Sequence, residues 1–220
     1  LGPLDPNVKK HNLAGVGAIS IKDRHRLIHL KPISPAFREA EANGRVMHFG
    51  MGTAGGKVVS IFVVYGYSGG AGNKYRASKT DAIFSAILSE RKCSPIGPCA
   101  IVGDINCDTE HLKTLSGMLQ QEGWTDIGKV AYRWNQPAEE YTVIAPGATV
   151  ATRRDYIFCN AEMTPMVRNF KVVHDNNMPT HSTLLLRLDI GSQITTTRTV
   201  KAPLSFYDSM LGNIIGVDGD

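Results

Sequence analysis

The sequence predicts a mixed α+β domain in which helices and sheet pack in layers around a common core. Strand-like runs alternate with two helical segments in the first part of the chain, and only strand-like runs follow. A regular βαβ winding would have kept its helices to the end. The length of 220 residues and the 42% hydrophobic content favour one folded domain with a tail and exclude wholesale disorder.

Strand-like runs rich in β-branched and small residues occupy the first part of the chain. They cover residues 15–21, 45–50 and 57–65. The dipeptides at 43–44 and 55–56, Asn-Gly and Gly-Gly, predict the turns between them. A further strand is predicted over residues 99–103, because this run is continuously apolar, as in a buried strand.

Two segments have helical spacing of apolar residues, at 79–92 and at 110–122. Pro95 follows the first, and Gly123 stands where a helix C-cap glycine would stand in the second. The rest of the domain is β-rich. Its predicted strands cover residues 141–145, 153–159, 167–173 and 183–190. The domain organisation expected is an N-terminal segment with a cut end at 1–14, the folded domain at 15–190 and an aperiodic C-terminal extension at 191–220.

Composition limits the partners and the compartment. Lysine and arginine total 24 against 20 acids, a net charge of +4, which permits a polyanionic partner without requiring one. The most apolar run, residues 58–65, is far shorter than the ~20 residues that span a bilayer as a helix, so no membrane span is predicted. Cys93, Cys99, Cys107 and Cys159 match neither a zinc spacing nor a disulfide scaffold, which favours reduced thiols and an intracellular chain, nuclear or cytoplasmic.

Gly-Asp-Ile-Asn at residues 103–106 directly follows the predicted buried strand, at the end of the sheet where open sheets place their sites. Alternation along an extended chain would send Asp104 and Asn106 to the same side. A carboxylate and a carboxamide at one point suit an anionic phosphate, since one handles protons or a metal and the other donates hydrogen bonds. The alternative is a simple turn, because both residue types bond their own backbone.

Asp155 begins a strand that is otherwise apolar, and a buried acid requires a partner. His181 lies 26 residues later, just before the last apolar strand, and a carboxylate could hold its imidazole in one tautomer. The alternative is a surface ion pair without function. His174 is expected to be exposed, and the glycine-rich loop 69–72 is expected to border a site rather than to cradle phosphate.

In order and spacing, these motifs resemble the endonuclease/exonuclease/phosphatase superfamily, whose members carry G-D-x-N, then R-x-D-Y, then a histidine ahead of the last core strand. The resemblance covers residues 15–190 and implies a four-layer α/β sandwich. It gives Asp104 a role in proton transfer and Asn106 a role in orienting the phosphate. Asp155 would hold the catalytic histidine, and His181 would be that histidine.

The resemblance also implies that Tyr65 approaches the phosphate and that Arg153 is structural, fixes Asp155 or binds substrate.

Two departures from the family pattern count against activity. Thr180 replaces the aspartate that precedes the histidine in the family, and the 14 residues before Gly15 lack the glutamate that holds metal in the family. The domain is therefore expected to be N-terminally truncated. The family proline after Tyr65 is replaced by Gly66.

The first functional hypothesis is a phosphodiester hydrolase dependent on Mg²⁺ or Mn²⁺. It would be an endonuclease acting on DNA, or derived from one, of the type fused to reverse transcriptases. A second hypothesis is an inactive remnant that serves as a binding module, and a third is a phosphatase of lipid or inositol phosphates. An exposed sheet edge left by truncation would promote self-association.

Overall fold

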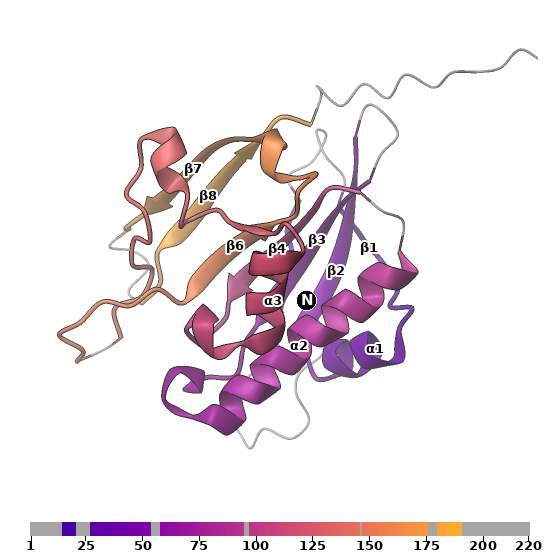
Figure 1. The fold of residues 1–220 in the computed structure, drawn as a ribbon, viewed down its shortest axis with the longest axis horizontal. Coiled ribbons are helices and arrows are strands. Elements are labelled where there is room, and N and C mark those ends of the chain that lie inside the picture. Colours follow the sequence, from indigo (N-terminus) through magenta and orange to yellow (C-terminus); the bar gives the residue numbers. More distant parts are fainter. Residues whose placement is uncertain are drawn as a thin grey trace, which may run out of the picture.

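The computed structural model describes residues 15–20, 27–53, 58–94, 97–145, 147–175 and 180–190. These residues form three layers (Figure 1): helices, a six-stranded sheet, and a two-stranded sheet on the other face of the first. The mixed α+β sandwich predicted from the sequence is confirmed, and the described residues form three of the four layers that the resemblance implies. Within the described residues, no helix is both long and apolar enough to cross a membrane.

The six-stranded sheet has the order β1-β2-β3-β4-β6-β5. Its strands are β1 Leu27–His29, β2 Val46–Gly52, β3 Val58–Tyr65, β4 Cys99–Asp104, β5 Thr125–Asp126 and β6 Asp155–Cys159. Only β3 and β4 are parallel neighbours, and every other pair is antiparallel. The ends of β3 and β4 therefore meet at one edge of the sheet, where the start of β6 joins them.

Three α-helices cover one face of this sheet. They are α1 Pro35–Ala42, α2 Lys74–Cys93 and α3 Lys113–Gln121, and the short 3₁₀ segments are η1 Gly70–Gly72, η2 Thr109–His111, η3 Ala131–Trp134 and η4 Thr164–Met166. Ser34 caps α1 through a bond from the backbone N–H of Phe37, and Asn73 caps α2. The helices bury apolar side chains against the central strands, which fixes the helical layer.

The second sheet consists of β7 Val167–Val173 and β8 Thr183–Leu188, paired antiparallel. It packs on the face opposite the helices, where Phe170 and Val172 join Ala100 and Ile157 in one apolar cluster. This packing places the residues just before β8 near the start of β6.

The strand predicted at 167–173 is present with the same ends, and those at 45–50, 57–65, 99–103, 153–159 and 183–190 are present with shifted ends. Both predicted helices are also present. The first helix begins five residues earlier than predicted, because Asn73 provides the cap. Gly123 follows the second with φ 70°, as expected for a C-cap glycine. The turn at 55–56 and the extension at 191–220 lie outside the described residues.

Two predicted strands are wrong. The described part of 15–21 pairs with no strand, and Val16 instead packs on the face of β2 against Met47 and Phe49. Apart from Val16 the segment is largely exposed, with Ile19 95% exposed, so its strand-like composition marks neither pairing nor burial. Segment 141–145 forms only isolated bridges at Val143. The elements β1, α1 and β5 were not predicted, since they are short and lack periodicity.

Candidate active site

Asp104 and Asp155 are neighbours on two adjacent strands of the large sheet. Asp104 is the last residue of β4, Asp155 is the first of β6, and the two are register partners. Alternation along β6 places Asp155 on the same face as Ile157, which belongs to the cluster under the second sheet. The two acids predicted as site residues therefore lie together at one end of the sheet.

Gly103 makes this arrangement possible. Its φ is +143°, and a Cβ there would lie 1.9 Å from the carbonyl oxygen of Val64 on the neighbouring strand. No side chain fits at that distance, so glycine is required for β3 and β4 to stay paired up to Asp104.

Asp104 and Asn106 form one hydrogen-bonded unit. The Asp104 Oδ1 accepts the backbone N–H of Asn106 at 2.9 Å, and its Oδ2 accepts the Asn106 side-chain amide at 2.8 Å. Asn106 is left-handed, with φ 54°, and also donates to the Gly66 carbonyl at 3.3 Å. The turn expected as the alternative does form, and the role of the two residues at a phosphate stays a prediction.

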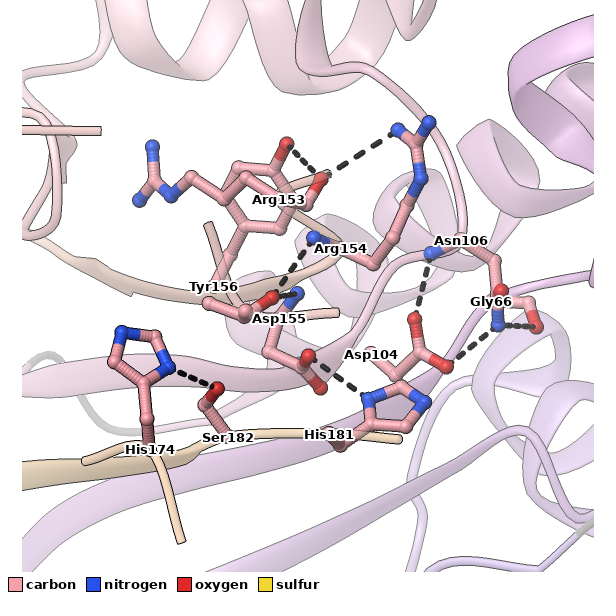
Figure 2. Close-up of polar contacts among 11 residues, drawn as sticks. Gly66, Asp104, Asn106, Arg153, Arg154, Asp155, Tyr156, His174, His181 and Ser182 are labelled. Atoms are coloured by element: carbon pink, nitrogen blue, oxygen red, sulfur yellow. Dashed lines mark hydrogen bonds and ion pairs between the residues drawn. The ribbon is translucent and has the colours of Figure 1, made fainter. Parts of the chain in front are cut away.

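Asp155 and His181 form a second unit (Figure 2). The Asp155 Oδ2 lies 2.9 Å from the His181 Nδ1. An ionised carboxylate can only accept, so Nδ1 carries a proton and Nε2 is left as the nitrogen that can exchange one. The Asp155 side chain is 16% exposed and that of His181 is 39% exposed, so the imidazole reaches solvent while its partner is sheltered.

The two units influence each other. Burial and the nearby negative charge of Asp155 raise the pKa of Asp104 to about 6, while His181 and the bonds from Asn106 work in the opposite direction. Figure 2 shows the His181 ring beside the Asp104 carboxylate. A carboxyl with a pKa near 6 can accept and return a proton close to neutral pH.

Thr142 holds the backbone of the Asp155–His181 unit. Its buried Oγ1 accepts the N–H groups of Arg154 at 3.0 Å and of Asp155 at 2.9 Å. Its carbonyl accepts the N–H of Ser182, next to His181, at 2.7 Å. No local sequence pattern singles out Thr142, because its partners come from segments that are distant in the chain.

Tyr65 ends β3 and is the register partner of Asp104. Its hydroxyl is 3.5 Å from the Ser68 Oγ, and the guanidinium of Arg45 is 5.2 Å from its ring centroid. The following glycine-rich loop packs on the Asp104–Asn106 turn, since a Cβ on Gly70 would be 3.0 Å from the Asn106 carbonyl oxygen.

Arg153 lies outside this group. Its guanidinium makes two bonds to the Asp126 carboxylate, one of 2.8 Å to Oδ2, and lies 4.4 Å from the centroid of the Tyr156 ring. Arg154, which the sequence did not single out, pairs with Asp108 in the loop that follows Asn106. The position of Arg153 favours the structural role over substrate binding.

A divalent metal was expected if the chain is active. No group of three or more His, Cys, Asp and Glu side chains in the described ranges is arranged to hold a metal ion. Both oxygens of Asp104 already accept from Asn106, and Oδ2 of Asp155 is engaged with His181. These residues alone do not fit a magnesium ion, which requires near-octahedral oxygen ligands.

Comparison with known proteins identifies the fold. No protein-family model matches the chain, and neither does any curated protein. Among solved structures, a variant of the 3′ phosphatase NExo from Neisseria, bound to a product DNA hairpin, is similar with a TM-score of 0.54 and 15% identity over 75% of this chain and 79% of that one. The endonuclease domain of TRAS1, a telomere-specific non-LTR retrotransposon, is similar with a TM-score of 0.51 and 16% identity over 76% and 68%.

An AP endonuclease from Archaeoglobus fulgidus is similar with a TM-score of 0.50 and 11% identity, over 69% of this chain and 68% of that one. These structures are all of the endonuclease/exonuclease/phosphatase type. The chain therefore has the endonuclease/exonuclease/phosphatase fold, which confirms the resemblance found in the sequence at the level of architecture.

Proposed function

We propose that the chain is a phosphodiester hydrolase that acts on nucleic acid, with DNA as its substrate. The observation that carries the proposal is the meeting of the Asp155–His181 pair with the Asp104–Asn106 unit at one end of the sheet. Two units that differ in protonation chemistry, placed together in a partly exposed site, are what cleavage of a phosphate ester requires.

In the proposed mechanism, Asp155 fixes the His181 ring so that Nε2 faces the reacting phosphate. Nε2 takes a proton from the attacking water or, when protonated, stabilises the charge on the phosphate oxygens. As the bond between phosphorus and the leaving oxygen breaks, Asp104, with its pKa raised to about 6, gives its proton to that oxygen and later regains one from water. Asn106 positions the phosphate, and Tyr65 contacts it from the neighbouring strand.

The choice of DNA is supported by the nucleases among the similar structures, one of which holds a DNA hairpin. The likeness to a retrotransposon endonuclease domain also supports an endonuclease of the type that is fused to a reverse transcriptase. Dependence on Mg²⁺ or Mn²⁺ stays a prediction, and no step above is routed through a metal.

The test is cleavage of supercoiled, nicked and abasic DNA by the purified chain in magnesium buffer, with EDTA as a parallel arm. We expect nicking that is lost in His181→Ala. A matched control is His29→Ala, since His29 also pairs with a carboxylate, Glu41 at 2.8 Å, but lies on β1. Absence of cleavage on all three substrates would contradict the proposal.

A second candidate is a binding module without turnover. Thr180 stands where the resemblance predicts an aspartate, and the described residues hold no metal cluster. Calorimetry with magnesium and an oligonucleotide separates the two functions. Binding of the oligonucleotide without cleavage would favour the module, whereas cleavage of the bound oligonucleotide that is lost in Asp104→Asn would favour the enzyme.

Two further proposals concern substrate and assembly. Lipid and inositol phosphates remain alternative substrates, and release of inorganic phosphate from them, with no cleavage of DNA, would favour a phosphatase.

Within the described residues β8 pairs only with β7, and Leu185 on β8 is 52% exposed. This edge is where self-association would occur, and light scattering that shows a monomer would exclude it.

A further inference from the structure

A second histidine lies close to the site and takes no part in the mechanism above. The His174 Nδ1 is 2.7 Å from the Ser182 Oγ, and its Nε2 is 2.9 Å from the Glu140 Oε1. The ring of Tyr141 stacks on the imidazole with centroids 4.5 Å apart. Every polar atom of the His174 side chain is thus engaged, and the residue is exposed, as the sequence predicted.

Serine, histidine and glutamate in a row are also the groups of a hydrolytic triad. A serine nucleophile requires free N–H groups to stabilise the oxyanion. The N–H of Ser182 is donated to the Thr142 carbonyl at 2.7 Å, and the next residue, Thr183, is paired with Val173 in the sheet. The N–H of Ser182 is therefore not free to stabilise an oxyanion, and the described contacts of the cluster favour a structural role.

The cluster of Glu140, His174 and Ser182 fixes the position of Ser182, the residue next to His181. Ser182 follows the catalytic histidine directly, and Figure 2 shows the His174–Ser182 contact beside the Asp155–His181 contact. Glu140 precedes the segment whose Thr142 holds the N–H of Asp155. The cluster thus ties the end of the second sheet to the segment that positions the other half of the catalytic pair.

The connection does not depend on the protonation of His174. The carboxylate of Glu140 accepts from Nε2, so a neutral ring presents Nδ1 as an acceptor for the Ser182 hydroxyl. A protonated ring donates from Nδ1 instead, and the same hydroxyl can accept. Both contacts persist in either state, as expected for a fixed support rather than a switch.

We propose that His174 is a positioning residue, which holds His181 in register with Asp155 through Ser182 and Glu140. The inference rests on the proposed hydrolase function for its kinetic consequence only. A lost support would misplace the imidazole relative to the phosphate, and a displacement of the order of 1 Å at a reacting group costs about 10- to 100-fold in rate.

The test uses His174→Ala and His174→Asn in the full chain, with His29→Ala as the matched control on another His–Glu pair. The asparagine amide can occupy the place of Nδ1 and keep the bond to Ser182. We expect His174→Ala to lower kcat about 10- to 100-fold with KM unchanged, and His174→Asn to retain most of the activity. Equal losses in both, or a loss only in KM, would overturn the proposal.

A second readout needs no catalysis. The ¹⁵N resonances of neutral His181 should report the Nδ1–H tautomer in the unaltered chain and a mixture of tautomers in His174→Ala. Ser182→Ala removes the same contact from the other side and should give the same mixture, which covers the case that His174→Ala does not fold. An unchanged tautomer in the folded variants overturns the inference, whereas a chain that shows the shift but cleaves nothing contradicts only the proposed function.

Discussion

His181 and Asp155 are 26 positions apart in the chain, and their Nδ1 and Oδ2 atoms are 2.9 Å apart. The contact joins two sheets, since Asp155 begins β6 of the large sheet and His181 precedes β8 of the small one. The packing of the two sheets is therefore what brings Asp155 and His181, the proposed catalytic pair, together.

Asp155→Asn tests the orienting role of this pair. An amide in place of the carboxylate can present its NH₂ group to Nδ1, which favours the wrong tautomer of His181. Comparable changes in an acid–histidine pair lower kcat by about 10³- to 10⁴-fold, and we expect a loss of this order. Glu162→Gln, at an exposed position before η4, is the control. Activity within a few-fold of the parent would show that Asp155 does not orient the histidine.

Asp104→Asn should lower activity and change how the stability of the chain depends on pH. The pKa of Asp104 is raised to about 6 in the folded chain from 3.8, so the folded state binds more protons than the unfolded state between these values. The ionised carboxylate therefore opposes folding above pH 6, by about 2 to 3 kcal/mol, and this opposition disappears as the pH falls toward 4. The asparagine also loses one of the two bonds that the carboxylate accepts from Asn106, a cost that is present at both pH values. Urea unfolding should therefore show that the stability of Asp104→Asn relative to the parent increases between pH 4 and pH 7.5. A relative stability that does not increase over this range would contradict the shift.

His48 should have the opposite effect on the pH dependence. It is 1% exposed, stacks on Phe62 with centroids 4.0 Å apart, and burial lowers its pKa to about 4. The unfolded chain binds a proton at this residue below its ordinary pKa of 6.5, so up to about 3 kcal/mol of stability is lost as the pH falls from 6.5 to 4. In His48→Phe the free energy of unfolding should decrease less over this range. An unchanged difference between pH 7 and pH 4 would count against a neutral buried His48.

Thr142 should be sensitive to the loss of its hydroxyl and tolerant of the loss of its methyl group. Thr142→Val leaves the N–H groups of Arg154 and Asp155 without their acceptor, at a cost of about 1 to 3 kcal/mol for each buried group. Thr142→Ser keeps the acceptor and should retain most of the activity. Thr152→Val is the control, because it is the same substitution at a threonine that bonds to residues 142 and 143 through its backbone only. Equal behaviour of the Ser and Val variants would exclude this role.

Arg153→Lys separates the structural role of Arg153 from the expected substrate contact. Lysine cannot reproduce the two-pronged bond to Asp126, which is only 7% exposed. We expect a loss of roughly 1 to 3 kcal/mol in the free energy of unfolding, with KM unchanged. A raised KM at unchanged stability would instead support substrate binding.

The sequence predicted the parts of this molecule that depend on local patterns. The apolar run before Asp104 and the helical spacing of α2 and α3 each identify an element without knowledge of its neighbours. Asp104, Asn106, Asp155 and His181 follow from their places at the ends of strands, and the structure brings them together.

The parts that were missed depend on distant segments. Segment 141–145 has strand composition, but in the described residues it forms isolated bridges and no ladder. Its contribution is the individual hydrogen bonds that Thr142 accepts from Asp155 and Ser182. His174 is exposed as predicted, but its partners, Glu140 and Ser182, were not predicted because they come from different segments. Arg153 seemed close to the site by motif, yet Asp126 on β5 holds its side chain.

The most direct test of the hydrolase proposal is single-turnover cleavage of a supercoiled plasmid by the unaltered chain and by His181→Ala, both first shown to be folded by circular dichroism. We expect the unaltered chain to convert supercoiled to nicked DNA, and His181→Ala to lower the rate by about 10³-fold or more. Equal rates in the two proteins, or no cleavage by the folded unaltered chain, would contradict the assignment of this site as a phosphodiester hydrolase.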